Sequence, residues 1–233
     1  MDKIAAILAV VDPTAAEQPA VAKAALIARR CAARLELLVC AAGEAAPGGA
    51  DRLLEGLAAP LRMRGLAVTT HSMVGAPLHE RLLERLRGAP VDLVVKDTHH
   101  HALLRRTLIT NTDWHLIRGC AQPLLLVKPK SWATHPVILA AVDPGHAGDP
   151  AAALDHRILA VAAAFGARLD AELHAVNAYF PATIATAAGA GMPPAIGVPP
   201  EALRAENDRR RAEIAALTAP YGVSGDRLHV GPG

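Results

Sequence analysis

A set of ionisable side chains follows the apolar run VDLVV, residues 91–95. The set consists of Lys96, Asp97, His99, His100 and His101. Short runs rich in valine are typical of strands buried on both faces in a parallel sheet. In open parallel sheets, ligands bind beyond the carboxyl ends of the strands. We therefore expect this segment to line a ligand crevice.

The three consecutive histidines suggest metal binding, but their spacing disfavours it. Neighbouring residues on an extended segment point apart, so only His99 and His101 can share a side. A polar loop, or hydrogen bonds to the helix that follows, explains them without a metal ion. The sequence also contains no G-x-S-x-G elbow, no P-loop and no H-E-x-x-H. We therefore predict no catalytic residues, no metal site and no bound cofactor in the first domain, and we leave the cofactor of the second domain open.

Lys96 has two interpretations that the sequence leaves open. Its strand is expected to be buried, where an ammonium group without a partner is costly to desolvate. The side chain either extends from the strand end into solvent, or it contacts an anion or ligand. Asp97 or Asp12 can pair with it across the crevice. Asp113 is explained by its place in the first turn of a helix, and Trp114 is expected in a core or interface.

Composition excludes several classes of protein. A formal net charge of +2 gives no case for a nucleic-acid surface. Three cysteines without metal-type spacing argue against a disulfide framework and for a reducing compartment. No apolar stretch reaches the ~18 residues that a membrane helix needs. We expect a cytoplasmic protein that binds neither membranes nor nucleic acids directly.

Strand-like and helix-like segments alternate along residues 1–130, which predicts an α/β doubly wound parallel sheet. The predicted strands are Ile4–Val11, Leu35–Cys40, Ala67–Ser72, Val91–Val95 and Leu124–Val127. The predicted helices are Val21–Ala33, a helix from Asp51, a helix from Pro77 to Gly88, and a helix ending at Gly119.

Local signals set the expected ends of these helices. Asp51 is a candidate N-cap, and Pro60 should kink or shorten the helix that Asp51 begins. Either Thr110 or Thr112 should cap the helix that carries Asp113. In the second half of the chain, Asp149 and Pro150 should open a helix that ends at Gly166.

The first half of the chain recurs in the second half. ILAVVDP at 7–13 reappears as ILAAVDP at 138–144, and ARLELLV at 33–39 is echoed within 167–176. HSMVG at 71–75 is matched in position by HVGPG at 229–233. Such self-similarity predicts two domains of one fold, at 1–130 and 135–233.

The second domain is expected to be incomplete. Its copy stops where the first copy has Gly75, so we interpret it as truncated after its third strand. Residues 181–200 should form a loop, followed by a helix from about Glu201 to Ala219. The two domains should pack on each other. The uncovered edge of the strand Val137–Val142 makes a homodimer possible.

The repeat, VVDP at the first strand end, and DLVV…TH…LLLVKP together resemble the universal stress protein family. VVKDTHHH and TNTDWHLIRGCAQPLLLVKP are similar to its tandem-domain E subgroup. The resemblance covers residues 3–129 well and 136–233 more loosely. It implies a flavodoxin-like, HUP-type five-stranded parallel sheet with the order 3-2-1-4-5.

ATP-binding members of that family carry Gly-x2-Gly-x9-Gly-Ser/Thr after the fourth strand, where backbone amides hold the phosphates. The four motif positions correspond here to Asp97, His100, Thr110 and Asn111. All three glycines are absent and Asp97 adds a negative charge. The resemblance therefore implies that the first domain does not bind ATP in the family manner.

The aspartate that faces the nucleotide in binding members is present in both copies, as Asp12 and Asp143. A turn residue that ends a strand before proline explains each of them equally well.

Three functions remain open from the sequence. The first is a non-catalytic cytosolic stress protein with a degenerate nucleotide motif; the subgroup implies tolerance of DNA-damaging stress. The second is an ATP-binding stress switch whose nucleotide site lies in the missing part of the second domain. The third, an enzyme on a related fold, has no coherent set of catalytic residues behind it.

Overall fold

The computed structural model describes residues 4–41, 48–75, 77–88, 91–98, 111–144, 150–179 and 199–232. The chain divides into two compact units, Asp2–Ser131 and Trp132–Gly233. We name them the N-terminal unit and the C-terminal unit and describe each by itself.

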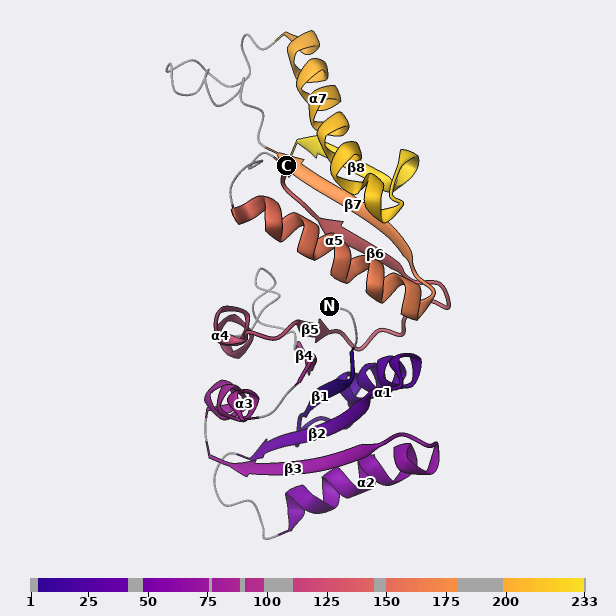
Figure 1. Ribbon diagram of the computed structural model, residues 1–233. Helices are drawn as coiled ribbons and strands as arrows, with labels where there is room; N and C mark the ends of the chain where they lie inside the picture. Colours follow the sequence, from indigo (N-terminus) through magenta and orange to yellow (C-terminus); the bar gives the residue numbers. More distant parts are fainter. Residues whose placement is uncertain are drawn as a thin grey trace. The chain divides into compact units, whose positions relative to one another are not determined.

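The N-terminal unit is built on a five-stranded parallel sheet (Figure 1). The strand order is β3-β2-β1-β4-β5, and each neighbouring pair is parallel. This confirms the predicted flavodoxin-like order 3-2-1-4-5. The strands are β1 (Ala6–Val11), β2 (Arg34–Ala41), β3 (Val68–Val74), β4 (Leu93–Asp97) and β5 (Leu124–Val127).

Four helices cover this sheet: α1 (Pro19–Cys31), α2 (Gly49–Met63), α3 (Leu78–Arg87) and α4 (Asn111–Gly119). Leu82, Leu86 and Leu116 bring α3 and α4 onto one face, where they pack in a core with Leu8 and Val94. Right-handed crossovers place α1 and α2 on the opposite face.

The central strands β1 and β4 are buried along their whole length. Helices cover both faces of the sheet, so neither face of these strands contacts solvent. This explains why the strands are continuous apolar runs and do not alternate between apolar and polar residues. The carboxylate of Asp92 joins their starting ends, because its Oδ2 accepts hydrogen bonds from the backbone amides of Ala5 and Ala6 at 2.8 Å each. This contact fixes the register in which Ile7 faces Leu93.

Helix α2 differs from the expectation at both ends. It begins at Gly49 after Gly48, so Asp51 lies in the first turn and accepts a hydrogen bond from the Ser72 hydroxyl instead of capping the helix. Pro60 was expected to kink or shorten the helix; it does not shorten it, since α2 continues to Met63, and the kink stays a prediction. Both Pro60 and Gly56 are exposed, so water can solvate the Gly56 carbonyl that loses its amide partner.

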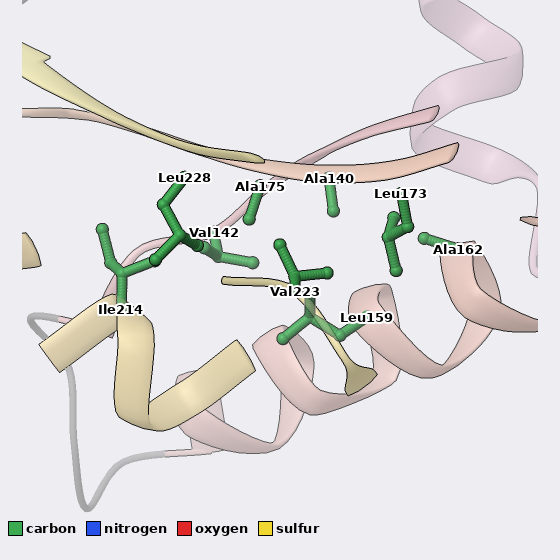
Figure 2. Packing of buried hydrophobic residues seen from close by; sticks show 9 residues of the cluster. All are labelled: Ala140, Val142, Leu159, Ala162, Leu173, Ala175, Ile214, Val223 and Leu228. Carbon is green, nitrogen blue, oxygen red and sulfur yellow. The ribbon is translucent and has the colours of Figure 1, made fainter. Parts of the chain in front are cut away.

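The C-terminal unit contains a smaller parallel sheet with the order β6-β7-β8. Its elements are β6 (Val137–Ala141), α5 (Pro150–Leu169), β7 (Glu172–Tyr179), α7 (Pro200–Thr218), two short 3-10 turns and β8 (Leu228–Pro232). Figure 2 shows Leu159 of α5 and Ile214 of α7 in one core cluster with the sheet residues Ala140, Ala175 and Leu228, where Ile214 lies beside Leu228.

The pairing registers relate the two sheets residue by residue. Ile7 faces Leu35 in the first sheet, and Ile138 faces Leu173 in the second. The equivalent of Leu35 is therefore Leu173. The ARL of 167–169 that the sequence alignment used lies instead in the last turn of α5.

The third strands follow the same register. Leu38 faces His71 in the first sheet, and Val176 faces His229 in the second. His71 and His229 thus occupy corresponding places, as the sequence alignment expected.

Helices α1 and α5 end in the same way, on non-glycine residues in the left-handed region. These are Ala32 with φ 52° and Asp170 with φ 54°. In each case the next amide reaches back to a helical carbonyl, Ala33 to Ala28 and Ala171 to Gly166, both at 2.9 Å. Gly166 therefore supplies a capping carbonyl from inside α5. The prediction that the helix ends at Gly166 is wrong, because α5 continues to Leu169.

The left-handed cap of α1 yields a stability prediction. Ala32→Gly should raise the free energy of unfolding by about 1 kcal/mol, because glycine has no Cβ to clash with the carbonyl in this conformation. Ala22→Gly, an exposed position inside the same helix, is the matched control and should lower it by about 0.5–1 kcal/mol. Urea denaturation of both variants measures the two effects. Destabilisation by Ala32→Gly would refute the capping argument.

Candidate functional site

A cavity of about 610 Å³ opens beyond the carboxyl ends of β1 and β4 in the N-terminal unit. This is the place where parallel sheets bind ligands. Val10, Val11, Pro13 and Leu78 make much of its wall apolar. Its polar lining consists of Asp12, Thr14, Cys40, Lys96, Asp97 and Thr112. The fold thus brings three of the sequence-derived candidates, Asp12, Lys96 and Asp97, to one crevice.

The Lys96 side chain is held inside the protein by a buried ion pair. Its Nζ lies 2.9 Å from Oδ1 of Asp113 and donates to the backbone carbonyl of Asp97 at 2.7 Å. The hydroxyl of Thr98 donates to the other Asp113 oxygen at 3.0 Å. Lys96 is 7% exposed and Asp113 is fully buried. Two residues at the end of β4 are therefore joined to the first turn of α4 through one carboxylate.

This geometry corrects two expectations for Lys96. The side chain does not extend into solvent, and the carboxylate that pairs with it is that of Asp113. Asp97 contributes its backbone carbonyl to Lys96. The Asp113 carboxylate gains from the helix N-terminus, as the sequence suggested, but it also balances a buried cation.

Asp97 is buried at the end of β4, and a second lysine acts on it from α1. Burial lowers the pKa of Lys23, and the nearby Asp97 carboxylate opposes that change. The Lys23 ammonium donates to the carbonyls of Lys128 at 3.0 Å and Lys130 at 2.5 Å, just past the end of β5. The charges of Lys23 and Lys96 are thus both engaged by groups of the protein itself.

Asp12 closes the turn after β1. Its Oδ1 accepts hydrogen bonds from the Thr14 amide at 2.8 Å and from the Thr14 hydroxyl at 2.7 Å. Its backbone exchanges two hydrogen bonds with the Gln18 side chain just before α1. The turn-forming role foreseen for an aspartate before proline is therefore present, and the same residue also lines the cavity.

Cys40 faces the cavity from the end of β2. Burial raises the pKa of its thiol to about 11, and the Arg81 guanidinium opposes the rise. Burial likewise raises the pKa of Cys120. These thiols are protonated near neutral pH, which makes them poor nucleophiles.

Several candidates lie elsewhere or outside the described residues. His99, His100, His101 and Thr110 fall in the range 99–110, which the structure does not describe. Asn111 is the first residue of α4, so Thr112 lies inside that helix and is not its cap. Asp143 belongs to the C-terminal unit, where its amide donates to Asp155 and its Oδ1 lies 3.8 Å from Arg210.

Sequence reasoning missed the partners that hold the site together. Lys23 and Cys40 belonged to no motif, and Thr98 stood in VVKDTHHH without a predicted role, because these roles depend on contacts between elements distant in the chain. Asp113 was noticed, but its pairing with Lys96 could not be read from spacing. Trp114 is 44% exposed, so it does not lie in a core, and its expected place in an interface stays a prediction.

Within the described part of the chain, no three His, Cys, Asp or Glu side chains converge as metal ligands would. In the same residues, every helix is too short or too polar to cross a lipid bilayer.

The buried ion pair yields a double-mutant prediction. Lys96→Met and Asp113→Asn should each lower the free energy of unfolding of the N-terminal unit by about 3–5 kcal/mol, because each leaves its partner buried without an opposite charge. The double variant should cost clearly less than the sum of the two. Urea denaturation of the four proteins gives the coupling energy. Additive losses would show that the two side chains do not interact.

The Cys40 thiol yields a reactivity prediction. A pKa of about 11 instead of 9.0 lowers its thiolate fraction at pH 8 about a hundredfold, so alkylation of the folded protein should be slow and should accelerate in urea. The unfolded thiol ionises first as the pH rises. The contribution of the Cys40 thiol to the free energy of unfolding is therefore complete below pH 9.0 and is lost progressively as the pH rises toward 11. Mass spectrometry after iodoacetamide treatment measures the rate at Cys40, and rapid native alkylation at pH 8 would contradict the prediction.

No protein-family model matches the chain. Among curated proteins, Universal stress protein E of Escherichia coli strain K12 is 29% identical over 164 residues, which are 66% of this chain and 48% of that protein. Universal stress protein E of Salmonella typhi is 31% identical over 106 residues, 43% of this chain and 32% of that protein. The chain thus spans about half the length of the E. coli relative and less of the Salmonella one.

Two solved structures from Pseudomonas aeruginosa are similar over almost the whole chain. A functionally unknown protein from strain PAO1 is 27% identical with a TM-score of 0.77, covering 99% of this chain and 74% of its own. A candidate universal stress protein from strain UCBPP-PA14 is 27% identical with a TM-score of 0.78 and the same coverage. In sequence and in fold, this chain is thus similar to universal stress proteins.

Proposed function

We propose that this chain is a non-catalytic universal stress protein whose N-terminal crevice does not hold ATP in the manner of binding members. The observation that carries the proposal is the buried Asp97 at the mouth of β4. In the family motif, a glycine stands at this position so that phosphates can approach the backbone. A carboxylate there adds both volume and negative charge where the phosphates would lie.

The cations of the crevice support the same conclusion. A polyphosphate is normally held by free cationic side chains or by backbone amides at a helix N-terminus. Lys96 lines the cavity, but the Asp113 carboxylate already neutralises it, and that carboxylate also occupies the first turn of α4. Releasing Lys96 for a phosphate would leave Asp113 buried without its cation, at a cost of several kcal/mol.

A second candidate function is an ATP-binding stress switch whose nucleotide site lies in the C-terminal unit. The observation that favours it is Asp143, which follows β6 as Asp12 follows β1, with the Arg210 guanidinium 3.8 Å away. Cζ of that guanidinium also lies 5.5 Å from the centre of the Tyr179 ring. Tyr179 is the last residue of β7, so this contact lies at the carboxyl end of the strand. A cation beside an aromatic ring is compatible with a nucleotide, although Asp143 already engages it.

The physiological part of the proposal rests on the likeness to Universal stress protein E alone. It comprises a cytoplasmic location, support of survival under stress, including DNA-damaging stress, and packing of the two units on each other. Sensitivity of a deletion strain to ultraviolet light, and its rescue by this chain, would test the survival role. Equal survival with and without the chain would refute it.

Nucleotide titration by calorimetry separates the two candidate functions. The chain should show no saturable ATP binding below about 1 mM, because the described residues of the N-terminal crevice form no phosphate cradle and the motif glycines are replaced. Asp12→Ala and Asp143→Ala are matched variants of equivalent positions in the two units. ATP binding that only Asp12→Ala abolishes would overturn the proposal. Binding that only Asp143→Ala abolishes would establish the second candidate instead.

A further inference from the structure

The chain leaves the N-terminal unit through a short segment that follows β5. Residues 128–131, which we name the strap, belong to no helix or strand and are exposed. Hydrogen bonds nevertheless fix the strap backbone. The Lys130 amide donates to the Lys128 carbonyl at 2.7 Å. The ammonium group of Lys23 donates to both carbonyls, at 3.0 Å to that of Lys128 and at 2.5 Å to that of Lys130.

Lys23 reaches the strap from a buried position in α1. The residue is 8% exposed, and Val21, Ala24 and Ile27 of the same helix are buried as well. A buried ammonium group is costly unless groups of the protein accept its hydrogen bonds. The two strap carbonyls meet that requirement. A lysine among buried apolar residues departs from the pattern of the helix, and such departures are expected where a specific contact outweighs apolar packing.

The strap itself buries little apolar surface. Its four residues are exposed, and Pro129 has no amide hydrogen to donate. Segments with few buried apolar contacts open locally at a low free energy. Hydrogen bonds from a charged donor are stronger than those between neutral groups. The two bonds from Lys23 should therefore contribute most to keeping the strap closed.

A carboxylate of the crevice lies on the same side of the sheet as Lys23. Successive side chains of a strand point to opposite faces of its sheet. Lys96 reaches Asp113 of α4, so Asp97, the next residue, points toward the opposite face, where α1 lies. The register of β4 and β5 also sets Asp97 opposite Val127, the residue just before the strap.

The electrostatics of Lys23 agree with this placement. Burial lowers the pKa of the Lys23 ammonium group, and the Asp97 carboxylate opposes that change. An opposite charge has this effect only when it lies nearby. Asp97 also lines the cavity. The carboxylate, the ammonium group and the two strap carbonyls therefore form one continuous electrostatic chain from the cavity to the end of the unit.

We propose that Lys23 is a positioning residue that fastens the strap to the N-terminal unit, and that the Asp97 carboxylate keeps the Lys23 ammonium group in place from the crevice. The attachment of the strap then depends on the charge of a residue that lines the cavity. This regulatory role does not rest on the proposed function, because it is independent of whether the crevice binds ATP.

Limited trypsin digestion of the full chain tests the proposal at one peptide bond. Trypsin cleaves after Lys130 but not after Lys128, which proline follows, so the fragment that begins at Ser131 reports on the strap. The cleavage rate follows the population of the locally opened segment. Lys23→Met should raise this rate by about tenfold or more, because methionine keeps an unbranched apolar side chain but donates no hydrogen bond.

Asp97→Asn tests the link to the crevice. Asparagine keeps the volume of the side chain and removes its charge, so the Lys23 ammonium group loses a stabilising neighbour. Cleavage after Lys130 should accelerate severalfold in this variant, although the substituted residue contributes no atom to the strap. Mass spectrometry of the fragment that begins at Ser131 measures the rate.

Two controls separate a released strap from a loosened fold. Arg29→Met also replaces a basic residue of α1, but Arg29 is exposed, so cleavage after Lys130 should keep its original rate. Within every variant, cleavage after Arg87, the last residue of α3 in the same unit, should also stay unchanged. Methionine at a buried position should preserve the fold, and melting curves check this for Lys23→Met.

Three results would overturn the proposal. The first is cleavage after Lys130 that is no faster in Lys23→Met than in the unchanged chain. The second is an acceleration that the site after Arg87 shares in equal measure, because it would report unfolding of the whole unit. The third is an unchanged rate in Asp97→Asn, which would refute the link between the crevice and the strap.

Discussion

The buried ion pair between Lys96 and Asp113 is the constraint on which the crevice depends. It joins the end of the central strand β4 to the first turn of α4, which are separated in the chain by the segment 99–110. Two charges removed from water are stable only together and with further hydrogen bonds. The Thr98 hydroxyl and the Asp97 carbonyl supply those bonds. Helix α4 is thereby held to one position at the mouth of the sheet.

This pair also decides what the crevice can offer a ligand. Lys96 lines the cavity, yet its ammonium group already forms an ion pair with Asp113. The ammonium group of Lys23 donates hydrogen bonds to backbone carbonyls beyond β5. Asp12 and Asp97 add two carboxylates to the lining. Within the described residues, these charges support the proposal that the crevice does not hold phosphates.

The two units show how one sequence motif acquires different environments. ILAVVDP and ILAAVDP both form a strand followed by an aspartate turn. In the N-terminal unit the strand is buried between two others and between two helical layers, so its leucine belongs to a core. In the C-terminal unit the equivalent leucine is exposed, because no described element covers that face. Burial is a property of the neighbours and not of the motif.

The sequence by itself determined the alternation of strands and helices, the parallel α/β sheet, and the edge at which Asp12, Lys96 and Asp97 meet, whereas the strand order 3-2-1-4-5 came from the family resemblance. Hydrophobic runs, capping residues and the internal repeat act locally or by simple periodicity, so they can be read in one dimension. Only the tertiary structure decided that Asp113 is the partner of Lys96, that Lys23 faces Asp97, and that Leu139 is exposed while Leu8 is buried. These contacts and exposures depend on which groups, distant in the chain, are buried together in a region of low dielectric constant. The spacing of residues in the sequence does not reveal this.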